Sequence, residues 1–106
     1  MSGRIVGEIL DHAPDDLTPA EMLVLIALAD DARDRDRTAR FHSSVASIAH
    51  RTRIKPGTVR NALSRLTNRG LIRTRHKAKP GLHQEYVIAN LNQAHRFATT
   101  RDEITP

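Results

Sequence analysis

The sequence contains no cysteine and very few aromatic residues. Without cysteine the chain can form no disulfide, no thiolate metal site and no cysteine nucleophile, and this composition fits a reducing cytoplasm. There is no Trp, one Tyr (Tyr86) and two Phe (Phe41 and Phe97), so we expect an aliphatic core. A chain of 106 residues predicts a single domain with short extensions.

Long apolar runs are also absent. The longest, residues 22–29 (MLVLIALA), has eight residues, whereas a membrane span needs roughly 18. The N-terminal stretch MSGRIVGEILDH has only a short apolar segment that includes Glu8, so we do not expect a signal peptide. The sequence therefore predicts no membrane association and a cytoplasmic location.

The usual signatures of catalytic and cofactor sites are missing as well. There is no Gly-x-Ser-x-Gly motif, no glycine-rich phosphate loop and no pair of carboxylates framed for acid/base work. The six histidines show no HxxxH, HExxH or HxH spacing, which argues against a metal site. We therefore expect neither an enzyme nor a cofactor, and no small-molecule ligand is evident.

What the sequence does have is an uneven distribution of charge. Residues 1–36 contain nine acids and three bases, residues 37–84 twelve bases and no acid, and residues 85–106 three acids and two bases. These segments carry −6, +12 and −1, which sum to the net charge of +5. Such segregation is typical of a surface that binds a polyanion, and it favours nucleic-acid binding over a merely solvated basic face.

The acidic N-terminal segment predicts two helices. Residues 3–11 form a short amphipathic helix, and a polar linker follows over residues 12–16. Its apolar side is made of Ile5, Val6, Ile9 and Leu10.

A second helix begins at Thr18, because Thr18-Pro19-Ala20-Glu21 combines a capping box with a proline in the first turn. We expect it to run to about Arg33. Its centre, residues 22–29, is apolar on every side, so it should be buried all round. The terminal segments or a second subunit would have to cover its outer face. The following alternation of acids and bases, residues 30–38, predicts a solvated loop.

The acid-free window predicts two short helices joined by a tight turn. After a very short strand at residues 39–42, Ser43 or Ser44 can cap a helix over about residues 44–51. The second helix occupies residues 55–70, with Pro56 in its first turn and Gly70 at its end. Its apolar positions recur at helical spacing and should face the core: Val59, Ala62, Leu63 and Leu66.

The other face of residues 55–70 has no acid and no large apolar group. Arg, Asn, Ser and Thr are the side chains that hydrogen-bond base edges in DNA, so we interpret this segment as a recognition helix. Because the first two turns usually enter the major groove, the candidates for base contacts are Thr58, Arg60, Asn61 and Ser64. The candidates for phosphate contacts beside them are Arg51, Arg53, Lys55 and Arg65.

A β-hairpin with a basic tip should follow Gly70. Residues 71–76 and 82–88 read as its strands, and residues 77–81 as its exposed turn. Its bases would contact backbone phosphates or reach into a minor groove: Arg73, Arg75, Lys77 and Lys79. Beyond it, Asn90 can cap a last helix, and residues 99–106 should be disordered.

The order of these elements resembles the winged helix-turn-helix. The match is carried by residues 44–49 (SVASIA), 58–59 (TV), 62–66 (ALSRL), 70–72 (GLI) and 86–88 (YVI). The pattern is similar to bacterial regulators of the MarR and GntR type, and especially to small winged-helix domains of plasmid and phage replication or control proteins. Those domains also open with a Leu-Thr-Pro-x-Glu helix, here residues 17–21.

This resemblance implies a mainly α fold with a small β-hairpin, in the α+β class. The winged helix-turn-helix would cover residues 17–89, between an N-terminal helix and linker (1–16) and a C-terminal helix and tail (90–106). Two positions depart from the pattern. Arg53 stands where glycine is usual, so a left-handed backbone there would cost ~1 kcal/mol. Lys55 stands where a capping Ser or Thr is usual, and it cannot accept the free N–H groups.

The sequence therefore predicts sequence-specific binding to double-stranded DNA, by a bacterial transcriptional regulator that is nucleoid-associated when bound. A plasmid or phage replication or partition factor is a second hypothesis, and a winged-helix module that binds protein is a third.

The terminal helices could cap the apolar helix within one chain or build a homodimer that reads two half-sites, and we favour the dimer. The residues in question are Ile5, Val6, Ile9, Leu10, Leu91, Ala94 and Phe97.

Overall fold

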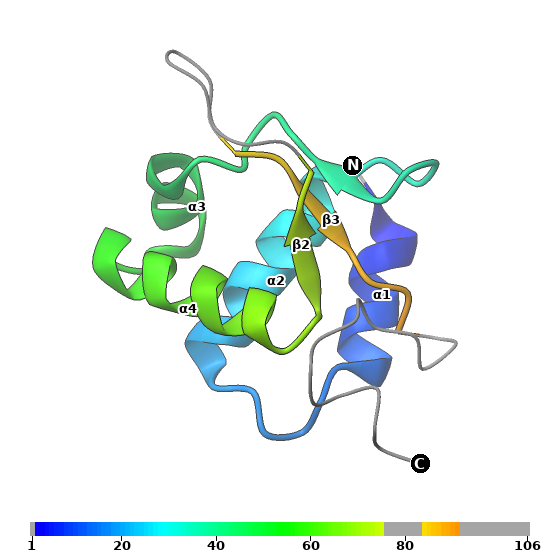
Figure 1. Cartoon of the computed structure of the whole chain (residues 1–106), viewed down its shortest axis with the longest axis horizontal. Coiled ribbons are helices and arrows are strands. Elements are labelled where there is room, and N and C mark those ends of the chain that lie inside the picture. The colour runs from blue at the N-terminus through cyan, green and yellow to red at the C-terminus, as the bar shows by residue number, and fades with distance from the viewer. Residues whose placement is uncertain (1, 76–83, 92–106) are drawn as a thin grey trace.

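The structure is a computed structural model that describes residues 2–75 and 84–91. These residues form four α-helices and a three-stranded antiparallel sheet (Figure 1). The helices are α1 (Gly3–His12), α2 (Pro19–Asp31), α3 (Val45–Thr52) and α4 (Pro56–Asn68), and the strands are β1 (Thr38–Ala39), β2 (Ile72–Thr74) and β3 (Tyr86–Ile88). The expectation of a mainly helical α+β fold with a small sheet is confirmed. The predicted hairpin tip and the C-terminal helix beyond Leu91 lie outside the described residues.

Helix α2 begins where its capping box predicts. The backbone N–H of Thr18 donates to Glu21 Oε1 (2.9 Å), and the N–H of Glu21 donates back to Thr18 Oγ1 (3.1 Å). The helix ends at Asp31 rather than near Arg33, because the next residue turns to an extended conformation and bridges Ala39. The end of α2 is therefore set by the pairing of Ala32 with Ala39 of β1, a contact that the local sequence does not predict.

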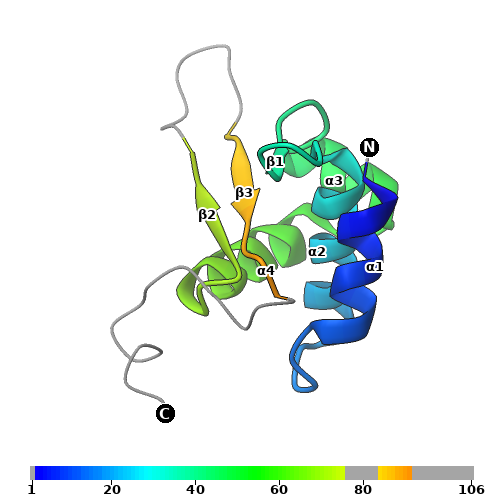
Figure 2. The same cartoon turned by 90° about the vertical axis from the view of Figure 1, so that its right-hand side faces the viewer.

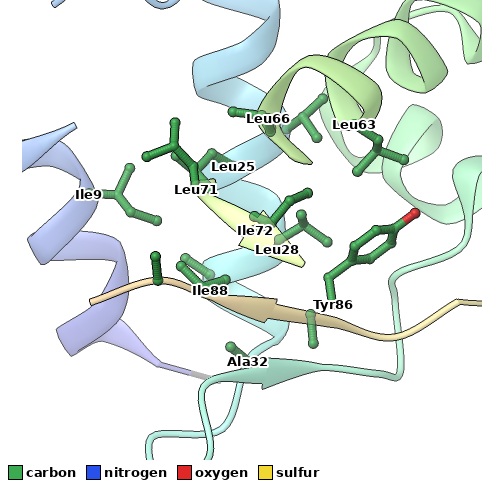
Figure 3. Packing of buried hydrophobic residues seen from close by; sticks show 14 of the residues in the cluster. Ile9, Leu25, Leu28, Ala32, Leu63, Leu66, Leu71, Ile72, Tyr86 and Ile88 are labelled. Atoms are coloured by element: carbon green, nitrogen blue, oxygen red, sulfur yellow. The ribbon is translucent and has the colours of Figure 1, made fainter. Parts of the chain in front are cut away.

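Helix α2 is the centre of the core. In Figure 1, α1 lies on one side of it and α3 and α4 on the other, and Figure 2 shows the β2–β3 pair on a further side. Leu25 and Leu28 of α2 are fully buried. Figure 3 shows side chains from α1, α4 and the sheet gathered around them, including Ile9, Leu66, Ile72 and Ile88.

The burial of α2 and α1 is less complete than predicted. Leu23 is 44% exposed. The expectation that α2 is buried all round is therefore wrong for the side of the helix that carries Leu23. Ile5 and Ile9 of α1 are fully buried in the chain's own core, whereas Leu10 is 60% exposed. Dimerisation through the terminal helices stays a prediction. Within residues 2–75 and 84–91, no helix has the length and apolar character needed to cross a membrane.

Strand β3 is the middle strand of the sheet, with β1 and β2 antiparallel to it on either side. The predicted strand at residues 39–42 is displaced and occupies only Thr38–Ala39. The cause is Asp31, whose Oδ2 accepts the backbone N–H groups of Phe41 and His42, each at 3.0 Å. These donors therefore cannot extend the ladder with β3.

The segment between α2 and β1 is tied into the fold by Arg37, although the sequence predicted a solvated loop. Arg37 has a left-handed backbone (φ 57°), and its guanidinium pairs with the carboxylate of Glu8. It also donates to the carbonyl oxygens of Ile88 (2.8 Å) and Ala89 (2.7 Å). Glu8 further accepts the N–H of Leu91 at 2.9 Å. One buried ion pair therefore joins α1, the loop and the end of β3.

Candidate nucleic-acid interface

Helices α3 and α4 pack against each other across a short turn. Ser44 caps α3 by accepting the N–H of Ser47 at 3.1 Å. In the turn, Arg53 adopts the left-handed conformation (φ 63°, ψ 28°), and Lys55 precedes α4 without a side-chain capping bond. Arg53 therefore adopts the left-handed conformation that favours glycine, and Lys55 provides no side-chain cap for α4.

Helix α4 separates its apolar and polar residues onto two faces. Val59 and Leu66 are fully buried, and Ala62 and Leu63 are at most 5% exposed. The outward face consists of exposed residues without an acid: Gly57, Thr58, Arg60, Asn61, Ser64, Arg65 and Asn68. The structure therefore brings the four predicted base-contacting side chains onto one accessible surface.

Many bases of the acid-free window are paired with acids from the N-terminal segment. The ion pairs are Arg37–Glu8, Arg40–Asp36 (3.7 Å), Arg51–Asp30, Arg65–Glu21 (3.7 Å), Arg69–Asp16 (2.7 Å) and Arg75–Asp36 (3.4 Å). Acids of the N-terminal segment and bases of the acid-free window therefore neutralise each other in the folded chain. Three predicted phosphate contacts are already engaged with an acid: Arg51, Arg65 and Arg75.

Asp36 is the acid with the most arginine partners among the described residues. It lies 2.7 Å from the Arg33 guanidinium and also faces Arg40 and Arg75. Burial raises the pKa of the carboxyl, but hydrogen bonds from Arg33 and from the Thr38 N–H outweigh it and hold the pKa at about 2. Asp36 therefore stays ionised at any physiological pH and keeps Arg75 beside it.

Within the described part of the acid-free window, three cations are left without an acid. In residues 2–75 and 84–91, no ion pair involves Arg53, Lys55 or Arg60. Arg53 and Lys55 lie in the turn, and Arg60 lies in the second turn of α4. Within the acid-free window, the described cations without an acid therefore lie together at the start of α4.

The amino end of α4 adds to this positive charge. Its first intrahelical bond is made by the N–H of Val59 to the Lys55 carbonyl (3.0 Å), so the N–H groups of Gly57 and Thr58 have no helical partner. A Cβ placed on Gly57 would meet nothing within 4 Å, so the approach is open. Free N–H groups and the helix dipole both favour an anion at such a position.

Of the four predicted phosphate contacts of the hairpin, two lie among the described residues. Arg73 and Arg75 are exposed in and just after β2, and Arg75 Nη1 lies 3.4 Å from the Thr38 hydroxyl as well as from Asp36. Lys77 and Lys79 lie outside the described residues. Arg37, another base of the acid-free window, is paired with Glu8.

The exposed face of α4 can accept and donate hydrogen bonds without presenting negative charge. Arg, Asn, Ser and Thr side chains there, with free N–H groups and three unpaired cations at one end, match the needs of a phosphate backbone and base edges. No group of three potential metal ligands occurs in the described part of the chain. No family model, curated protein or solved structure matches the sequence.

Proposed function

We propose that the chain binds double-stranded DNA as a winged helix-turn-helix, with α4 in the major groove and β2–β3 as the wing. The observation that carries the proposal is the position of the unpaired cations. Arg53, Lys55 and Arg60 flank the open amino end of α4, while other arginines of the window are neutralised by acids. A polyanion would find its strongest attraction beside the face that can read bases.

The contacts divide by position on this surface. Arg53 and Lys55, in the turn, are assigned to phosphates, which fix the register without reading sequence. Thr58, Arg60 and Asn61, on the first two turns of α4, are assigned to base edges, with Ser64 one turn further on. Asn61 is the best single reader because a carboxamide can bond both N6 and N7 of adenine.

Selection of bound sequences from random duplex DNA, repeated over a salt series, tests this function. We expect one enriched motif and an affinity that falls steeply with salt. Asn61→Ala should lose ~1–3 kcal/mol on the preferred site and relax selection at one base pair. Steep salt dependence without an enriched motif would refute sequence-specific reading, and absence of duplex binding at low salt would favour a module that binds protein.

The same surface serves either of two biological roles. A transcriptional regulator that binds as a homodimer should select an inverted repeat with half-sites about 10 base pairs apart. A replication or partition factor should instead select an array of direct repeats. Because both roles use the same face of α4, the arrangement of the selected sites distinguishes them.

A further inference from the structure

A groove of about 330 Å³ lies between α4 and the sheet. Its polar lining comes from Arg60, Ser64, Thr67 and Asn68 of α4, Thr74 of β2 and Tyr86 of β3. Arg60, Ser64 and Asn68 also belong to the exposed face of α4. The groove is therefore continuous with the proposed DNA surface.

Tyr86 places a hydrogen-bond donor without a partner beside this groove. The residue is only 9% exposed, and Figure 3 shows its hydroxyl directed away from the sheet, toward the side of Leu63 on α4. The hydroxyl makes no hydrogen bond within the described ranges 2–75 and 84–91. The hydroxyl oxygen itself is not among the fully buried side-chain atoms that lack a partner, so it reaches the surface of the groove that Tyr86 lines. A free hydroxyl at that surface can donate to a molecule that enters the groove.

The chemistry of the groove favours an anionic acceptor. Among the described residues that line it, Arg60 is the only charged one and none is an acid. The Thr67 hydroxyl is already used, because it donates to the Leu63 carbonyl at 2.8 Å. Burial raises the pKa of the Tyr86 phenol, so the hydroxyl keeps its proton and remains a donor at neutral pH. A guanidinium and a phenol O–H from residues that line the same groove suit phosphate oxygens.

We propose that this groove receives a backbone phosphate of bound duplex DNA, with the Tyr86 hydroxyl and the Arg60 guanidinium donating to its oxygens. The assignment rests on the proposed function. It moves Arg60 from base reading to phosphate binding and leaves base reading to Thr58, Asn61 and Ser64. On this assignment Tyr86 binds phosphate, a role that its position in an apolar strand does not suggest.

Tyr86→Phe in the full chain tests the assignment, because it removes the hydroxyl and keeps the ring. We expect about tenfold weaker binding to every duplex sequence alike, since a hydrogen bond to a charged group is lost and phosphates carry no sequence information. The unfolding midpoint should not fall. Thr67→Val is the matched control, because it removes a hydroxyl from the same groove that is already bonded to Leu63. It should bind as wild type does.

Two outcomes would overturn the assignment while leaving the function intact. One is wild-type duplex affinity in Tyr86→Phe. The other is a response to inorganic phosphate alone, read from the fluorescence of Tyr86, which is the only tyrosine in a chain without tryptophan. A change with millimolar phosphate that Arg60→Gln abolishes would reassign the groove to a free phosphate ligand. If the wild-type chain binds no duplex at low salt, the proposed function fails as well.

Discussion

Two arginines of the α3–α4 region make a matched pair for testing how the surface contacts DNA. Arg51 and Arg53 are two residues apart, but Arg51 is paired with Asp30 and Arg53 has no acid partner. Each phosphate neutralised by a cation contributes about −0.9 to the slope of log K against log salt. We therefore expect Arg53→Gln to make the slope shallower by about 0.9, and Arg51→Gln to leave it nearly unchanged.

The expected difference is large enough to measure by equilibrium titration of a labelled duplex. With phosphate contacts from Arg53, Lys55 and Arg60 alone, a fourfold rise in salt weakens binding by about 40-fold, and with two contacts by about 12-fold. Further contacts elsewhere add equally to both proteins. Arg4→Gln, on α1 across α2 from α4 (Figure 1), controls for the change in net charge. Equal reductions in slope for the Arg51 and Arg53 variants would refute the reasoning.

Three further predictions concern stability. Arg53→Gly should raise the free energy of unfolding, measured by urea titration, by about 1 kcal/mol, because glycine adopts φ 63° without strain. The same variant should weaken DNA binding as Arg53→Gln does. A lower free energy of unfolding would contradict this prediction. Glu8→Gln should lower the free energy of unfolding by about 3 kcal/mol, because it leaves Arg37 buried without a counterion. Asp16→Asn, which removes one partner of an exposed ion pair, should lower it by less than about 1 kcal/mol. Similar losses in the two variants would contradict a larger contribution from the buried pair. Because the pKa of Asp36 is lowered from 3.8 to about 2, its contribution to stability is present above about pH 4 and is lost as the pH falls toward 2, so the melting temperature of Asp36→Asn should depend less on pH in that range.

Local chemistry was the part of the fold that could be predicted from sequence. The capping box at Thr18 and the cap at Ser44 act within one helical turn, and both form as expected. The apolar spacing of α4 likewise specified its buried face, because helical periodicity is a property of neighbouring residues. The extent of the strand near residue 39 was predicted wrongly, because its end depends on Asp31, which is ten residues away from Phe41.

The charge of the candidate site could be predicted only in part. The sequence showed the acid-free window but not that acids fold back onto it, because pairs such as Arg69–Asp16 join residues 53 positions apart. Arg51 and Arg53 were both predicted to contact phosphates, but in the structure Arg51 is paired with Asp30. Tyr86 was likewise read as an ordinary strand residue, because the groove beside it exists only once α4 and the sheet have packed together.

The most direct test of the account is a titration of duplex DNA at low salt with the wild-type chain and with a variant that neutralises the three unpaired cations, Arg53→Gln, Lys55→Gln and Arg60→Gln. We expect the wild-type chain to bind, and the variant to lose nearly all affinity while unfolding at an undiminished temperature. Failure of the wild-type chain to bind duplex DNA, or wild-type affinity in the variant, would contradict the claim that the start of α4 is a DNA-binding surface.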